Sequence, residues 1–143
     1  MTSYKGRSQS KLVNAVFYLL NPIPFGFFVA GLIFDVTYFR TAELMWTKSA
    51  AWLIVLGLFF AIVPRLINLV RTWVVRRRSV SLGERADFFL NLVGIIAAIF
   101  NAFVHSRDAY AVMPLGFLLS ITTVTSIGIG TIVLSVSKGA GDE

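Results

Sequence analysis

The chain has 143 residues, a length that normally forms one domain. Hydrophobic residues make up 57% of it and charged residues 14%, with a mean hydropathy of +0.79, whereas soluble domains carry about a quarter charged residues. This balance argues against a soluble protein, and the absence of cysteine excludes disulfides and thiolate chemistry. The net charge is +6, and the basic residues flank apolar segments. This placement indicates orientation in a membrane, and we expect no nucleic-acid partner.

The N-terminal region mixes polar and apolar residues. Lys11, Asn14 and Tyr18 alternate with apolar neighbours, which predicts a short interfacial helix over about 9–20. A basic start before an apolar stretch resembles a signal peptide, but "NPIP" at 21–24 interrupts the stretch and a second apolar run follows. We therefore expect the N-terminal segment to be retained.

Four further segments are long and apolar enough to cross a bilayer, because a hydrocarbon core about 30 Å thick needs about 20 helical residues. The predicted spans are about 22–39, 46–67, 87–104 and 112–136. The predicted fold is therefore an all-α integral membrane protein, one membrane domain over 1–143 with four transmembrane helices in a bundle.

The basic residues are distributed unevenly between the two sides of these spans. Nine lie before the first span, between the second and third, or after the fourth, and Arg65 at the boundary makes ten; this group includes the loop residues Arg76, Arg77 and Arg78. Only Arg40, Lys48 and Arg107 lie on the other side. Since positive residues stay cytoplasmic, both termini are predicted to face the cytoplasm.

The stretch "VPRLINLV" (63–70) places polar residues at the inner end of the second span. Arg65 lies nineteen residues after Trp46, about 28 Å along a helix, so its guanidinium can reach the headgroups. The helix is expected to continue beyond the membrane, with Pro64 loosening it. A second interpretation pairs Arg65 with Asp87. Together with Asn68 and Asn91, these two residues are predicted to form an inner polar layer.

Asp35 is the most deeply placed carboxylate, roughly 20 Å into the bilayer from Pro22. A carboxylate at that depth should be paired or protonated. Asn101 and His105 lie at a similar depth, which predicts a polar clamp between Asp35 and one of them. Two alternatives stay open: a proton or ion relay through the same residues, and a carboxylate that accepts hydrogen bonds from the first outer loop.

In the fourth span, Thr122, Ser126 and Gly130 recur every four residues. Stripes of small residues allow close helix packing, so these three are predicted to face another helix. Gly26 with Ala30, and Gly94 with Ala98, offer matching small faces.

The sequence contains little that indicates catalysis. His105 is the single histidine, so bis-histidine haem ligation would need two protomers, and nitrogen and sulfur donors for a transition metal are scarce. Phosphate-binding glycine loops and nucleophile elbows are also missing from the sequence. We expect no enzyme activity, no cofactor and no metal.

The segment "NPIPFGFFVAGLIFD" (21–35), with Pro24 followed eleven residues later by Asp35, resembles a bacterial membrane family, domain of unknown function 2231. The second span, "FFLNLVGIIAAIFNAFVHSRD" and the Gly/Ser/Thr-rich last span fit the same resemblance. It implies a four-span membrane domain, with Pro24, Asp35, Arg65 and Asn68 as structural signatures. Many relatives carry histidine where this chain has Asn21, and some look linked to redox modules.

The leading functional prediction is a non-catalytic accessory or scaffold subunit of a larger membrane complex, such as a respiratory or redox one, in the bacterial inner membrane. Its expected partners are the lipid bilayer and either other membrane subunits or a second copy of itself. One alternative is a small ion or proton transporter or channel that uses Asp35 with His105 or Arg65. The other is a haem-binding electron carrier assembled across a homo-oligomer.

Overall fold

The computed structural model describes residues 21–75 and 81–139, with side chains described outside 63–75. Within these residues it contains four α-helices and one short 3-10 helix, and no strand. They are α2 (Ile23–Thr41), α3 (Leu44–Val75), α4 (Leu82–His105), η1 (Ala109–Ala111) and α5 (Leu115–Gly139). The predicted interfacial helix at 9–20 and the loop residues Arg76, Arg77 and Arg78 lie outside the described residues.

Each of the four α-helices contains a segment long and apolar enough to cross a membrane. In α3 that segment is Leu44–Ile62, and the other three helices qualify over their whole length. The predicted all-helical fold with four spans of membrane length is therefore confirmed. This composition suggests a multi-pass membrane protein.

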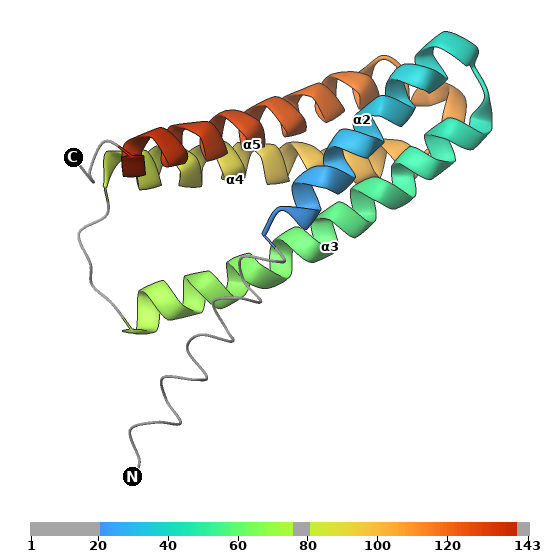
Figure 1. The fold of residues 1–143 in the computed structure, drawn as a ribbon. Helices are drawn as coiled ribbons and strands as arrows, with labels where there is room; N and C mark the ends of the chain where they lie inside the picture. Colours follow the sequence, from blue (N-terminus) through green and yellow to red (C-terminus); the bar gives the residue numbers. More distant parts are fainter. Residues whose placement is uncertain (1–20, 76–80, 140–143) are drawn as a thin grey trace.

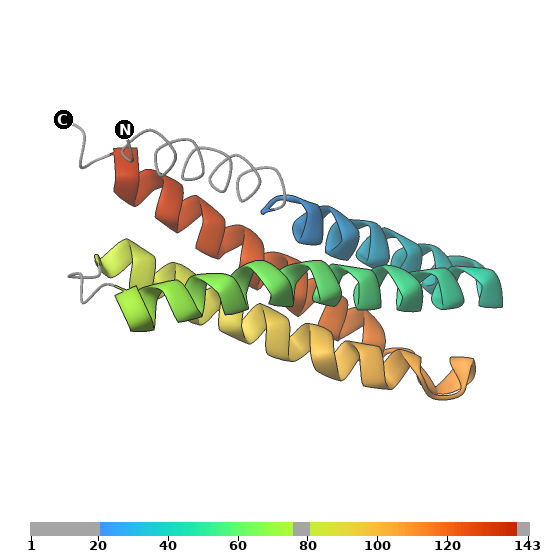
Figure 2. The same cartoon turned by 90° about the horizontal axis from the view of Figure 1, so that it is seen from below.

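The helices form a bundle in which chain neighbours run in opposite directions (Figures 1 and 2). Helix α2 packs against α3 and α5, and α4 packs against the same two helices. Consequently α2 and α4 occupy opposite corners of the bundle. The α2–α3 and α4–α5 connections, residues 42–43 and 106–114, lie at one end, which we call the loop end (Figure 1).

A tight connection joins α2 to α3. Helix α2 starts directly after Pro22 with a second proline, Pro24, in its first turn, where the missing N–H is not needed. It ends at Ala42, whose backbone is left-handed (φ 55°) and whose N–H donates to the Tyr38 carbonyl at 2.8 Å. Only two residues then separate α2 from α3, so the two helices form a helical hairpin.

Helix α3 is longer than the predicted span. It has 32 residues and reaches Val75, which corresponds to about 48 Å of helix against a hydrocarbon thickness of about 30 Å. The backbone stays helical through Pro64 and past the predicted end of the span at residue 67, whereas a continuation beyond the membrane stays a prediction. The side chains of Arg65 and Asn68 lie in the segment whose side chains are not described.

Helices α4 and α5 start at different residues from those predicted. The start of α4 at Leu82 precedes the predicted Asp87 because Ser81 and Glu84 form a capping box: each side chain accepts a hydrogen bond from the other's backbone N–H. The predicted start of the fourth span at residue 112 was three residues too early. Met113 precedes a proline, a position that disfavours helical backbone, and α5 begins at Leu115.

The centre of the bundle is a layer of buried apolar side chains from all four helices, which we call the apolar layer. It consists of Phe28, Ile54, Leu58, Ala61, Ala98 and Ile127. Small residues bring α4 and α5 together, since a Cβ at Gly94 would lie 2.6 Å from Ile127 Cγ1.

Within this chain, the burial of α5 matches the predicted packing stripe only in part. Thr122 is exposed, Ser126 is only partly buried, and Gly130 alone is buried. The buried positions of α5 are Gly116, Ser120, Thr123, Ile127 and Gly130. With 3.6 residues per turn, a strict four-residue repeat drifts by about 40° at each step, so it leaves the packed face. Gly26 likewise faces open space within the chain.

Candidate functional site

The most unusual feature of the bundle is a buried carboxylate–histidine pair near the loop end. His105 Nε2 lies 2.8 Å from Asp35 Oδ1, and neither side chain is exposed. Asp35 comes from α2, and His105 is the last residue of α4. The structure therefore brings Asp35 together with one of the two partners predicted for it, across the diagonal of the bundle.

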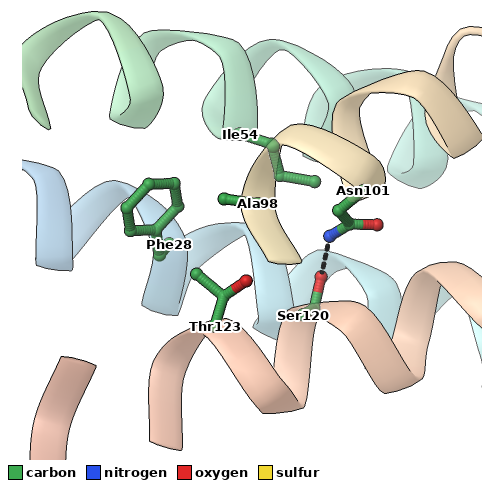
Figure 3. A pocket seen from close by; sticks show the side chains of 6 residues that line it. All are labelled: Phe28, Ile54, Ala98, Asn101, Ser120 and Thr123. Carbon is green, nitrogen blue, oxygen red and sulfur yellow. Dashed lines mark hydrogen bonds between the residues drawn. The ribbon is translucent and has the colours of Figure 1, made fainter. Parts of the chain in front are cut away.

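A serine from α5 joins the pair. The Ser120 hydroxyl donates to Asp35 Oδ2 at 2.5 Å and accepts a hydrogen bond from Asn101 Nδ2 at 2.7 Å. His105 Nδ1 lies 3.0 Å from the main-chain carbonyl oxygen of Asn101. The contacts thus begin and end on Asn101, and we call Asp35, Asn101, His105 and Ser120 the polar ring. The ring connects three helices, and Figure 3 shows its Asn101–Ser120 contact.

Asn101 contributes to the ring in a different way from the one predicted. Its side chain reaches Asp35 only through Ser120. Its Oδ1 atom is buried and has no hydrogen-bond partner among the described residues. An unsatisfied buried acceptor costs about 1–3 kcal/mol, so this amide stabilises the ring less than the other polar groups do.

Close packing surrounds the polar ring. On the loop side, the Tyr38 hydroxyl donates to the Ala109 carbonyl at 3.1 Å, and Val112 is fully buried. A Cβ at Gly116 would lie 2.9 Å from His105 Cε1, so the glycine is what leaves room for the imidazole.

On the opposite side, the ring borders the apolar layer. The space lined by Phe28, Ile54, Ala98, Asn101, Ser120 and Thr123 is too small for a water molecule (Figure 3). A substrate would find no volume next to the ring on this side.

The ring contains serine, histidine and aspartate, but their order of contact differs from that of a hydrolytic triad. In such a triad the imidazole lies between the hydroxyl and the carboxylate and takes the hydroxyl proton. Here the Ser120 hydroxyl contacts the carboxylate, and both imidazole nitrogens are engaged elsewhere. This arrangement does not prepare Ser120 for nucleophilic attack.

A second polar contact lies near the opposite end of α4. Asn91 Nδ2 donates to Asp87 Oδ1 at 2.6 Å and to the Asp87 carbonyl at 2.9 Å. Gly130 of α5 packs against both side chains, since its Cβ would lie 3.1 Å from Asp87 Oδ1. Asp87 and Asn91, two members of the predicted inner polar layer, are thus in contact. The other two predicted members, Arg65 and Asn68, have side chains that the structure does not describe.

The two polar regions are separated by apolar packing. Asn91 and Asn101 are ten residues apart on α4, about 15 Å along the helix. Between them, the buried face of α4 consists of Gly94, Ala97 and Ala98. These residues carry no proton-transfer group.

Within residues 21–75 and 81–139, no three His, Cys, Asp or Glu side chains lie close enough together to hold a metal ion. For haem, His105 would have to leave either Asp35 or the Asn101 carbonyl to become an axial ligand.

Ser120 and Tyr38 are site residues that the sequence analysis missed. Ser120 lies five residues into α5 from the loop end, and Asp35 lies six residues before the end of α2. At 1.5 Å per residue, these positions correspond to about the same depth. Comparing polar residues by their distance from the shared end would have identified Ser120 as a partner.

The chain matches no protein-family model, no curated protein and no solved structure. The resemblance to domain of unknown function 2231 therefore stays a prediction.

Proposed function

We propose that this protein is a non-catalytic membrane protein of the bacterial inner membrane that serves as an accessory or scaffold subunit of a larger membrane assembly. One observation carries the proposal: the buried carboxylate and imidazole, the groups best suited to chemistry, already form hydrogen bonds within the chain. Both oxygens of Asp35 and both nitrogens of His105 have partners within the chain. In this proposal the polar ring is a structural clamp.

The proposed orientation has both termini in the cytoplasm and the loop end outside. Three basic side chains lie at or beside the loop end, Arg40, Lys48 and Arg107, and all three are exposed. The predicted spans assign the other ten basic residues to the opposite side or its boundary, and the positive-inside rule favours this orientation.

The outer faces of the helices support a membrane environment with neighbouring helices. Large apolar side chains are widely exposed there, including Trp52 at 71%, Phe103 at 66% and Phe59 at 63%. Soluble proteins rarely expose apolar surface on this scale. Lipid and the helices of other subunits are both suitable contacts for it.

The transporter alternative has less support. A proton path through one chain would have to cross the apolar layer, where the described side chains carry no ionisable group. The alternative predicts a pH-driven flux in proteoliposomes that Asp35→Asn abolishes. We expect the same background flux for the wild type and Asp35→Asn.

The decisive experiment is purification of the tagged protein from its native membrane in mild detergent, with co-purifying chains identified by mass. Stoichiometric recovery of other membrane subunits is the expected result. An unrelated four-span protein with the same tag is the control. Recovery as a monomer or homo-oligomer alone, together with a flux that depends on Asp35, would overturn the proposal in favour of transport.

A further inference from the structure

The contacts of His105 determine where its protons lie. Its Nδ1 atom is 3.0 Å from the main-chain carbonyl oxygen of Asn101. A carbonyl oxygen has no proton to donate. The hydrogen bond therefore requires a proton on Nδ1, and the tautomer protonated only on Nε2 does not fit this contact.

The other ring nitrogen faces a carboxylate oxygen. Nε2 and Asp35 Oδ1 are 2.8 Å apart, within hydrogen-bonding distance. One proton must lie between these two atoms, because otherwise two lone pairs would face each other. It resides either on Nε2, giving an imidazolium and a carboxylate, or on Oδ1, giving a neutral imidazole and a carboxylic acid.

Both arrangements contain the same number of protons and the same net charge. With Nδ1 protonated and one further proton shared, the charges of Asp35 and His105 sum to zero in either form. Loss of the shared proton would leave a carboxylate with no counter-charge on a side chain that is 0% exposed. A buried charge without a partner is strongly destabilising.

The remaining contacts of the ring strengthen this proton count. Asn101 Nδ2 donates to Ser120 Oγ, so the Ser120 proton points to Asp35 Oδ2. The second carboxylate oxygen is thus an acceptor, and the shared proton belongs to the Oδ1 side. Among the described side chains, His105 is the basic group in a salt bridge with Asp35, while Arg40, Lys48 and Arg107 are exposed.

We propose that the polar ring is a binding site for one proton, held between Asp35 Oδ1 and His105 Nε2 in an electrically neutral pair that also requires a proton on Nδ1. The bound proton makes the contact between α2 and α4 attractive without placing net charge inside the membrane. This inference is independent of the accessory-subunit proposal, because it concerns the ring whatever partner the protein has.

The test is nitrogen-15 NMR of histidine-labelled protein in lipid bilayers at neutral pH. His105 is the single histidine, so every imidazole signal belongs to it once the affinity tag is one without histidine. The protein also carries carbon-13-labelled aspartate, so the Asp35 carboxyl is identified by the contact of its carbon-13 with the ring nitrogen-15. The expected spectrum shows a protonated Nδ1 with either an imidazolium and a carboxylate, or a neutral ring and a carboxylic acid.

Two results for the wild-type protein would overturn the proposal. One is a neutral ring protonated on Nε2 alone. The other is a neutral ring protonated on Nδ1 beside an ionised Asp35, which would be one proton short. Asp108→Asn is the control, because it removes a carboxylate from the exposed loop and not from the ring. This variant should leave the imidazole signals unchanged. Asp35→Asn should give a neutral ring with the proton still on Nδ1, because the new amide can donate to Nε2; an Nε2-protonated ring in that variant would also contradict the proposal.

Discussion

Asp35 and His105 are 70 residues apart in the chain and on helices at opposite corners of the bundle, yet Nε2 lies 2.8 Å from Oδ1. The contact crosses the diagonal because Gly116 leaves room beside the imidazole and because Ser120 of α5 engages the other carboxylate oxygen. One carboxylate therefore connects α2 with both α4 and α5. Disturbing it should affect the whole loop end of the bundle.

Replacement of Asp35 by leucine should destabilise the protein strongly. The change leaves His105 Nε2 and the Ser120 hydroxyl without their partner, and breaking a buried ion pair from one side costs about 3–5 kcal/mol. The measurement is the free energy of unfolding in detergent. Arg107→Leu, at an exposed position, is the control and should stay within about 0.5 kcal/mol of wild type. Equal effects of the two changes would refute the clamp.

Ser120→Ala should cost about 1–3 kcal/mol, because it leaves Asp35 Oδ2 and Asn101 Nδ2 buried without a partner. Ser135→Ala removes the same hydroxyl from an exposed position on the same helix, and its effect should be within about 0.5 kcal/mol. Thermal unfolding of both variants in the same detergent compares them directly. A Ser120→Ala protein as stable as the Ser135→Ala protein would exclude the serine from the clamp.

Asn101→Leu should be tolerated better than Ser120→Ala. The leucine removes the unsatisfied Oδ1, and Ser120 keeps its own donation to Asp35. The main-chain carbonyl still accepts from His105, so we expect a loss within about 1 kcal/mol. Asn101→Asp should be more harmful because it adds a second carboxylate beside Ser120. The prediction fails if the leucine variant unfolds more easily than Ser120→Ala.

Gly116→Ala should disturb the imidazole. Its Cβ would lie 2.7 Å from Val112 Cγ1 and 2.9 Å from His105 Cε1, and overpacking of this kind typically costs about 1–3 kcal/mol. Gly128→Ala is the matched control on α5, since its Cβ would make an ordinary 3.6 Å contact with Phe25 Cζ. The control should be neutral or gain up to about 1 kcal/mol of helix propensity. The histidine NMR signals should shift in the first variant and not in the second.

The four apolar helices could be predicted from the sequence because span length depends only on local hydrophobicity and bilayer thickness. Their ends were less accurate because these depend on local backbone chemistry. The Ser81–Glu84 capping box moved the start of α4 to Leu82, and Pro114 moved the start of α5 to Leu115. Both signals are present in the sequence, but the hydrophobic pattern alone does not show them.

Matching depths along the first and third spans predicted either Asn101 or His105 as the partner of Asp35, but the rotation of each helix about its axis could not be predicted. Whether Thr122 or Thr123 faces the bundle depends on about 100° of rotation per residue, which hydrophobicity does not resolve in a helix that is apolar on every side. Thr123 is buried and Thr122 is exposed. For the same reason, the role of Ser120 required the packed structure.

The order of the polar ring along the chain has a consequence for biosynthesis. The two-residue connection between α2 and α3 lets them enter the bilayer as one hairpin, which delivers Asp35 while His105 is still 70 residues away. At a synthesis rate of about 5–20 residues per second, His105 is added roughly 4 to 14 s after Asp35. An aspartate opposes insertion by about 2.5–3.5 kcal/mol at a helix centre and by less toward a helix end, and Asp35 lies between the two. We therefore expect chains arrested after α3 to insert α2 less efficiently than the same chains carrying Asp35→Leu, so that the residue which fastens the finished bundle is the one that hinders its assembly.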